Sequence, residues 1–186
     1  MNTELQSPQD IRQQIWKELG RASQDRHHAW RTPVLATVGR DGAANARTVV
    51  LRGVDAPRQS LRIYTDVRSP KVGELVNESN ALFVFWSARL SWQLRVRVAV
   101  SIDTEGPEVQ ALWQQIRQSA SAGDYLGAMA PGSPCLDEHM NAAQTQDVNH
   151  FALLSATVLE MDWLELGRGG HRRARLRADT WQWLTP

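Results

Sequence analysis

The stretch RTVVLRGVDAPRQSLRIYTDVRSPK, residues 47–71, decides the fold of this chain of 186 residues. It begins within a strand expected over about 46–52, and residues 61–65 alternate apolar and polar side chains as a half-buried strand does. A turn that contains a proline separates the two strands. Ser69 and Pro70 then start a helix expected over about 70–77, because serine is a common helix cap and proline fits the first helical turn. These signals predict successive strands that lead directly into a short helix.

Cationic and hydroxyl side chains gather at the ends of these three elements. Arginines bracket the first strand, a tyrosine and a threonine end the second, and a lysine lies in the first turn of the helix. The residues concerned are Arg47, Arg52, Tyr64, Thr65, Arg68, Ser69 and Lys71. Charge-assisted hydrogen bonds and the positive end of a helix are what hold a phosphate monoester. The stretch therefore predicts a binding site for a phosphorylated small molecule.

The rest of the chain extends this pattern into one domain, 1–186. A helix is expected over about 8–28 with Ser7 as its cap, and Asp41-Gly42 indicates a hairpin turn. Further strands are expected over about 33–38, 81–86, 93–101, 152–159, 163–166, 173–177 and 181–184, with a helix over about 107–118. This set predicts an α+β, mainly β protein built on an antiparallel β-barrel. The barrel would comprise about 33–101 and 151–186, with a helical and loop insertion at about 107–149.

Composition excludes several classes of protein. The formal net charge is +1 at pH 7, so no strong overall field draws the chain to nucleic acid or to a membrane. Cys135 is the only cysteine, which excludes an intramolecular disulfide and a cysteine-rich zinc site. The histidines, His139 among them, lack the spacing of a metal site. With neither a secretion signal nor an apolar run of about 18 residues, we expect a cytoplasmic protein that does not cross a membrane.

Four short sequence segments occur in a characteristic order along the chain. They are Arg-x-Val-x-Leu-Arg at 47–52, Tyr-Thr at 64–65, Ser-x-Lys at 69–71 and a segment from Trp86 to Gln93. Together they resemble the FMN-binding segments of the pyridoxamine 5'-phosphate oxidase-like flavoproteins, in the branch usually described only as FMN-binding. The resemblance covers about 30–101 and resumes weakly over 151–186. It implies an FMN-binding split β-barrel that forms a homodimer with FMN in the subunit interface.

The resemblance also implies roles for single residues. Arg47, Thr65 and Lys71 would hold the flavin phosphate, and the backbone of 49–51 would run beside the flavin ring. Gln93 suits the ring edge, because a primary amide both donates and accepts hydrogen bonds, and it is expected to come from the second subunit. The expected cofactor-binding residues are Arg47, Thr48, Val49, Val50, Leu51, Arg52, Tyr64, Thr65, Arg68, Ser69, Lys71, Gln93 and Arg173. No catalytic residue and no metal ligand is assigned.

The chain departs from the family pattern at two places. Pro70 stands directly before the lysine, where the family commonly has arginine, and Arg68 is the candidate to replace it. The segment HRRARLR, residues 171–177, has charge but not the order Arg-Leu-His-Asp-Arg that true pyridoxamine phosphate oxidases carry for substrate phosphate and flavin. Arg173 is the candidate to reach the flavin, and a solvated basic strand is the competing interpretation. The missing order puts pyridoxamine phosphate as the substrate in doubt.

Three functions are compatible with these observations. The leading hypothesis is an FMN-dependent oxidoreductase, in which the cofactor supplies the hydride chemistry. The alternative is a non-catalytic split-barrel module that binds flavin or haem. A third, nucleic-acid binding through the arginine-rich segment, is opposed by the near-neutral net charge, and we expect no nucleic-acid partner.

Overall fold

The computed structural model describes residues 7–134 and 148–186. Cys135 and His139, with part of the expected loop, lie outside the described residues. The described chain forms one nine-stranded sheet whose strand pairs are all antiparallel. The strands are β1 (Val34–Val38), β2 (Ala44–Thr48), β3 (Leu51–Asp55), β4 (Ser60–Asp66), β5 (Asn80–Ser87), β6 (Trp92–Asp103), β7 (Phe151–Glu165), β8 (Arg172–Leu176) and β9 (Trp181–Leu184). The expected α+β, mainly β architecture is confirmed.

The sheet closes on itself between β2 and β3. Its strand order is β2-β1-β5-β6-β7-β4-β3, so two strands that follow each other in sequence stand at opposite ends of the order. The Val49 N–H donates to the Pro33 carbonyl at 3.0 Å, and the Leu51 N–H donates to the Arg31 carbonyl at 2.9 Å. These bonds lay the chain before β1 along the start of β3, and they turn the sheet into a barrel.

The single strand expected over about 46–52 is therefore wrong. The chain changes partner within it, because β2 pairs with β1 and β3 pairs with β4. Val49 and Leu51 are both buried, so the alternation of side chains continues across the break. Periodicity reports which face a residue takes, but it carries no information about the neighbouring strand.

The two strands expected over about 152–159 and 163–166 are also wrong, because they form the single strand β7 of 15 residues. Asp162, in the gap between the two expected strands, has a side chain that is almost fully buried. It forms ion pairs with Arg95 of β6 at 2.6 Å and with Arg173 of β8 at 2.8 Å. The buried charge of Asp162 is thus compensated by arginines from the strands on both sides.

The helices follow the sequence signals more closely. Ser7 and Asp10 exchange capping hydrogen bonds at the start of the first helix, which ends earlier than about 28. Its residues Ile11, Ile15 and Leu19 are fully buried against the barrel core. The helices are α1 (Pro8–Gln24), α2 (Pro70–Asn77) and α3 (Pro107–Ile116), followed by the 3-10 turn η1 (Ala120–Tyr125).

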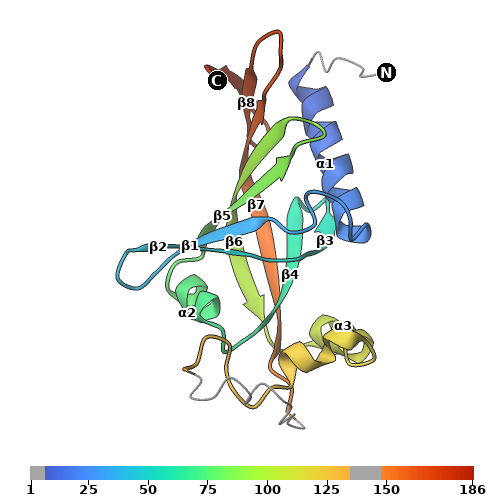
Figure 1. Cartoon of the computed structure of the whole chain (residues 1–186), viewed down its shortest axis with the longest axis vertical. Helices are drawn as coiled ribbons and strands as arrows, with labels where there is room; N and C mark the ends of the chain where they lie inside the picture. Colours follow the sequence, from blue (N-terminus) through green and yellow to red (C-terminus); the bar gives the residue numbers. More distant parts are fainter. Residues whose placement is uncertain (1–6, 135–147) are drawn as a thin grey trace.

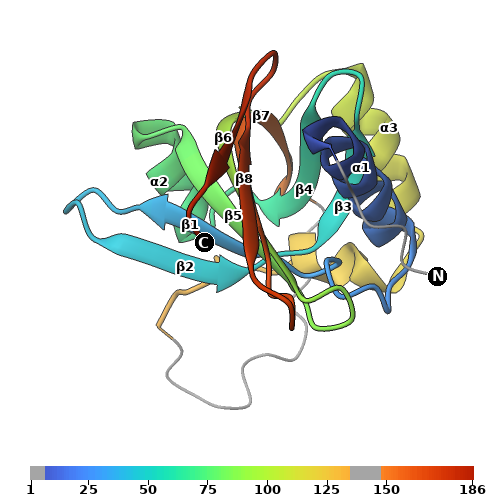
Figure 2. The same cartoon turned by 90° about the horizontal axis from the view of Figure 1, so that it is seen from above.

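The helices lie on different sides of the barrel. Figure 2 shows α2 on one side, near β1, and α1 and α3 on the other side, near β3 and β4. Figure 1 shows α3 at the opposite end of the molecule from the β8–β9 hairpin. A second, smaller core packs α3 and η1 against Tyr64 and Phe151 on the outer face of the sheet. None of the described helices is long and apolar enough to span a membrane, and the cytoplasmic location stays a prediction.

Candidate functional site

The residues predicted to bind phosphate meet at one end of the barrel, where α2 begins. Arg47 of β2 pairs with the buried Leu35 of β1, so its side chain is on the core-facing side of the sheet. Thr65 is buried on the same face of β4 as Ile63. The first turn of α2 brings Lys71 to this end of the barrel. Residues from two strands and a helix thus converge, although they are far apart in the extended chain.

Lys71 is partly buried and is held by hydroxyl groups. Its Nζ donates to Thr65 Oγ1 at 2.9 Å and to Ser69 Oγ at 2.6 Å. Within the described residues it forms no ion pair. Burial lowers the pKa of Lys71 and the nearby charge of Arg47 lowers it further, against the opposing effect of Asp66 and Glu74. A cation in such surroundings gains from any anion that reaches it.

Ser69 stands at the N-cap position of α2, as predicted, but the predicted side-chain cap is wrong. Its hydroxyl makes no capping hydrogen bond and instead accepts from Lys71. Ser69 is almost fully buried. Because the cap is unused, the amides of the first turn are left without this partner, and a helix start of that kind favours a negative charge.

Arg47 is held by a second network on the other side of the same cluster. Its Nη1 donates to Thr37 Oγ1 at 2.5 Å, and its Nη2 lies 2.8 Å from Glu74 Oε2. The Thr37 hydroxyl donates to the same Glu74 oxygen at 2.5 Å. Asn45 Nδ2 donates to the other oxygen, Oε1, at 3.0 Å. The guanidinium that we predicted for the phosphate therefore has a fixed position, with part of its donors already bound.

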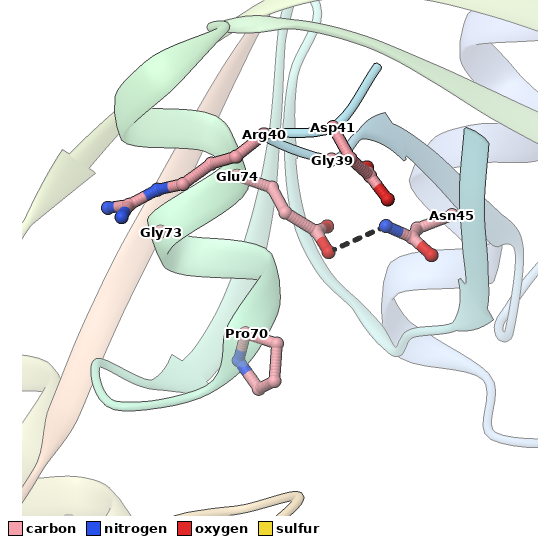
Figure 3. A pocket seen from close by; sticks show the side chains of 7 residues that line it. All are labelled: Gly39, Arg40, Asp41, Asn45, Pro70, Gly73 and Glu74. Atoms are coloured by element: carbon pink, nitrogen blue, oxygen red, sulfur yellow. Dashed lines mark hydrogen bonds between the residues drawn. The ribbon is translucent and has the colours of Figure 1, made fainter. Parts of the chain in front are cut away.

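A cavity of about 440 Å³ opens beside Glu74, between the turn after β1 and the first turns of α2. Figure 3 shows Glu74 pointing toward Asn45 across this space, while Arg40 points away from it. The lining residues are Gly39, Arg40, Asp41, Asn45, Pro70, Gly73 and Glu74. The hollow is open to solvent, and it is reached by Asn45 and Glu74 of the Arg47 network but not by Lys71.

Arg68 binds Asp66 and the loop after η1. Its guanidinium binds the Asp66 carboxylate in a bidentate contact of 3.1 and 2.7 Å. It also donates to the Gly127 carbonyl at 2.8 Å and to the Ala128 carbonyl at 3.2 Å. These contacts fasten the loop after η1 to the turn before α2. Most of the Arg68 donors are therefore committed to Asp66 and to these carbonyls.

Arg52 and Tyr64 are also apart from the cluster. The guanidinium carbon of Arg52 lies 5.7 Å from the centre of the Tyr64 ring. Tyr64 packs edge-on against Phe151, with ring centres 5.2 Å apart, and burial raises the pKa of its hydroxyl. Tyr64 packs against the smaller core on the outer face of the sheet, and Arg52 lies over its ring. Thr65, the next residue, faces the opposite way because successive side chains of a strand alternate.

Gln93 and Arg173 share a row that crosses the sheet. In register, Trp86 of β5 is opposite Gln93, which is opposite Leu164, which is opposite Arg173. Residues opposite one another share a face, and this is the outer face, since the neighbouring Trp163 is buried in the core. Within one chain, Gln93 and Arg173 are thus on the other side of the sheet from Arg47 and Lys71.

Arg173 is tightly paired on that outer face. Its Nε and Nη2 donate to the two oxygens of Asp162 at 2.9 and 2.8 Å, which raises the pKa of Arg173. Burial acts to raise the pKa of Asp162, but the hydrogen bonds from Arg173 and Arg95 hold it below its usual value. Arg173 is therefore part of an ion-pair network, and it is not a merely solvated strand residue.

The backbone between β2 and β3 offers free hydrogen-bonding groups. Val49 and Leu51 use their N–H groups to close the barrel, and both side chains are buried. Thr48 is exposed at the end of β2. No hydrogen bond of the Val50 backbone is found in the described part of the chain. This break in the pairing leaves main-chain donors and acceptors available to a flat ligand.

The sequence interpretation missed Thr37, Asn45 and Glu74. Two signals were present in the chain. A hairpin turn at 39–42 sets Thr37 opposite Asn45, as the register shows, and Glu74 follows Lys71 by three positions on one helix face. Among the described residues, no group of three or more histidine, cysteine or acidic side chains is arranged to hold a metal ion.

Comparisons with known proteins identify the family of the chain. Residues 13–103 match the family model described as pyridoxamine 5'-phosphate oxidase, FMN-binding domain. Pyridoxine/pyridoxamine 5'-phosphate oxidase 2 of Arabidopsis thaliana is 30% identical over 167 residues, which cover 81% of this chain and 83% of the relative. The pyridoxine/pyridoxamine 5'-phosphate oxidase of Thermobifida fusca (strain YX) is 43% identical over 77 residues, 34% of each chain.

Solved structures show the same fold. A pyridoxamine 5'-phosphate oxidase-related, FMN-binding protein of Nostoc punctiforme PCC 73102 superposes with a TM-score of 0.74 at 24% identity, covering 97% of this chain and 98% of that one. PhzG of Burkholderia lata 383, solved with tetrahydrophenazine-1-carboxylic acid, gives a TM-score of 0.75 at 17% identity, covering 100% and 98%. These likenesses confirm the expected split barrel.

Proposed function

Because the chain belongs to the pyridoxamine 5'-phosphate oxidase family of FMN-binding proteins, we propose that it binds FMN with the phosphate at the start of α2. Lys71, Arg47, Thr65 and Ser69 would hold the phosphate oxygens. Charge-assisted donors at this spacing suit a phosphate monoester better than a neutral group.

The observation that carries the proposal is the state of Lys71. It is a partly buried ammonium held by two hydroxyls, with Arg47 nearby and no ion pair in the described chain. Burial and the nearby charge of Arg47 disfavour the charged form of Lys71, and an anion that binds beside both cations offsets this cost. A phosphate dianion bound between Lys71 and Arg47 would attract both cations and would stabilise the charged form of Lys71.

The flavin ring is proposed to lie along the break between β2 and β3. The unpaired backbone of Val50 supports this position, since a flavin ring carries both donors and acceptors at its edge. Gln93 is on the outer face of the sheet and can reach such a ring only from another copy of the chain. The proposal therefore includes a homodimer in which each site takes Gln93 from the partner.

The reaction we propose is that of an oxidoreductase. Bound FMN would supply hydride transfer, which protein side chains do not perform. The part of this chain is to bind the phosphate, to orient the ring through the Val50 backbone and to exclude water by pairing with a second copy. No acid or base of the described residues is needed for these tasks.

The test is a titration of FMN with purified protein, read from the quenching of flavin fluorescence. Saturable quenching with one FMN per chain supports the proposal. Unchanged fluorescence at high micromolar protein refutes it, and tight haem binding in a parallel titration would favour the haem-binding alternative. Stopped-flow mixing of the loaded protein with NADPH, NADH or pyridoxamine phosphate then separates an enzyme, which reduces its flavin, from a carrier, which does not.

The shared site has its own test in subunit complementation. Lys71→Met and Gln93→Ala each damage both sites of their own homodimer. A mixed dimer of the two variants contains one site with both native residues and one with neither. Random exchange in an equal mixture makes about half of the dimers mixed, each with one intact site of its two. Recovery of about a quarter of the wild-type FMN binding therefore supports the proposed dimer, while no recovery after subunit exchange contradicts it.

A further inference from the structure

Glu74 places a negative charge next to the residues proposed to bind a phosphate. Its carboxylate is 2.8 Å from Arg47, next to the cluster proposed to bind an anion, and its side chain is only 12% exposed. A fixed negative charge so close to a phosphate would weaken its binding, because like charges at a few ångströms repel. The position calls for another explanation.

Three donors from two strands converge on this one carboxylate. Thr37 of β1 and Arg47 of β2 bind Oε2, and Asn45 of β2 binds Oε1. Thr37 is almost fully buried, and its hydroxyl also accepts from Arg47. If an incoming anion displaced Glu74 from Arg47, the hydrogen bonds from Thr37 and Asn45 would still hold the carboxylate in place. The network is built to keep Glu74 in place while the site is in use.

The network fixes one edge of the Arg47 guanidinium. Nη1 is engaged by Thr37, with the Leu35 carbonyl at 3.4 Å, and Nη2 is engaged by Glu74. An arginine side chain has five N–H donors in a rigid fork, so the remaining donors keep a set direction when one edge is bound. Free arginine loses about 2 kcal/mol of rotamer entropy when it is ordered, and here part of that loss occurs before the ligand arrives.

We propose that Glu74 is a positioning residue for the phosphate of the cofactor, acting through Arg47. It holds one edge of the guanidinium so that the other edge meets the anion beside Lys71. This inference rests on the proposed function, which it deepens by naming the residue that pre-organises the site. It makes a prediction opposite in sign to that of simple charge repulsion.

The test compares Glu74→Ala with the wild type, using FMN and inorganic phosphate as probes. Glu74→Ala removes a negative charge, yet positioning predicts that the dissociation constant for FMN rises about tenfold, which corresponds to about 1.4 kcal/mol. Glu74→Gln keeps an acceptor for Arg47, since Asn45 can rotate its amide to face the new side chain, and it should restore most of the affinity. Glu78→Ala, at the other end of α2, is the matched control and should leave the dissociation constant for FMN unchanged.

A double-mutant cycle separates positioning from a general disturbance of α2. In an Arg47→Ala background, Glu74→Ala should have no further effect on FMN affinity, because the residue through which it acts is gone. A second readout is independent of FMN: NMR of the arginine side chains should show slower rotation of the Arg47 guanidinium in the wild type than in Glu74→Ala, which loses the contact at Nη2.

The outcomes are distinct. If Glu74→Ala binds FMN as tightly as the wild type or more tightly, the carboxylate is only an opposing charge and the inference is overturned. An equal loss in the Arg47→Ala background overturns it as well, since the effect then comes through the helix. If the wild type binds neither FMN nor inorganic phosphate, the proposed function fails together with the inference.

Discussion

Replacing Lys71 with methionine should weaken FMN binding far more than it changes the stability of the protein without FMN. Methionine keeps the length of the side chain and removes its charge. The ammonium that would meet the phosphate now lies 2.9 Å from Thr65 Oγ1 and 2.6 Å from Ser69 Oγ. Hydrogen bonds to charged groups contribute about 1.5–3 kcal/mol. The dissociation constant for FMN should therefore rise about 10- to 150-fold.

The stability of the protein without FMN should change little. Burial and Arg47 lower the pKa of Lys71, which means that the folded protein disfavours the charged amine relative to the unfolded chain. Removing that charge relieves the folded state, while the buried hydroxyls of Thr65 and Ser69 lose a partner. Because these two effects oppose each other, the melting temperature of Lys71→Met in the absence of FMN should stay close to that of the wild type.

The assay is fluorescence titration of FMN together with thermal unfolding, each with and without FMN. Lys17→Met is a matched control, because Lys17 is the only other lysine and is exposed on α1. It should leave the affinity unchanged. The reasoning is refuted if Lys71→Met binds FMN within about twofold of the wild type, since the loss would then be below that of any hydrogen bond to a charged group. An equal loss in Lys17→Met would show a non-specific charge effect.

Three further predictions concern Lys71, Asp162 and Ile15. The lowered pKa of Lys71 means that its amine loses its proton at a lower pH than an ordinary lysine does. FMN affinity should therefore fall as pH rises toward the pKa of Lys71. In a pH series of titrations, Lys71→Arg should abolish this fall, because arginine keeps its charge. Asp162→Ala should lower the free energy of unfolding by about 1–3 kcal/mol in urea, because Arg95 and Arg173 lose their partner. The stabilisation by Asp162 should be present above the pKa of an unfolded aspartate and disappear as pH falls through its lower folded value. Ile15→Ala should cost about 2–5 kcal/mol, since this side chain of α1 is fully buried in the barrel core; a loss under 1 kcal/mol by the same urea assay would contradict the role of α1 in the core.

Local signals predicted the elements that depend on nearby residues. The helix Pro70–Asn77 was correctly predicted, as were the start of α1 and the hairpin turn at 39–42. A proline, a capping serine or an Asp-Gly pair acts on the backbone within a few residues, so its effect can be read without the rest of the fold. The strand expected over about 46–52 failed because its two halves pair with strands that stand far apart in the sheet.

The sequence likewise predicted some features of the candidate site and missed others. Arg47, Thr65 and Lys71 come together as expected from the order of the motifs, but their roles remain predictions until they are measured. Arg68, which seemed equivalent in charge, is committed to Asp66 and to the loop after η1. A sequence shows that a cation is present, but it does not show which anion or carbonyl will lie within 3 Å of it.

The amino-acid sequence alone therefore determined the family, the sheet-forming pattern and the cations available for a phosphate, because these depend on residue type and spacing. Only the tertiary structure decided which cations remain available, and it assigned Glu74 to Arg47. It also separated Gln93 from Lys71 by the thickness of the sheet. The physical reason is that hydrogen bonds and ion pairs act over a few ångströms, and barrel closure alone brings such distant segments that close.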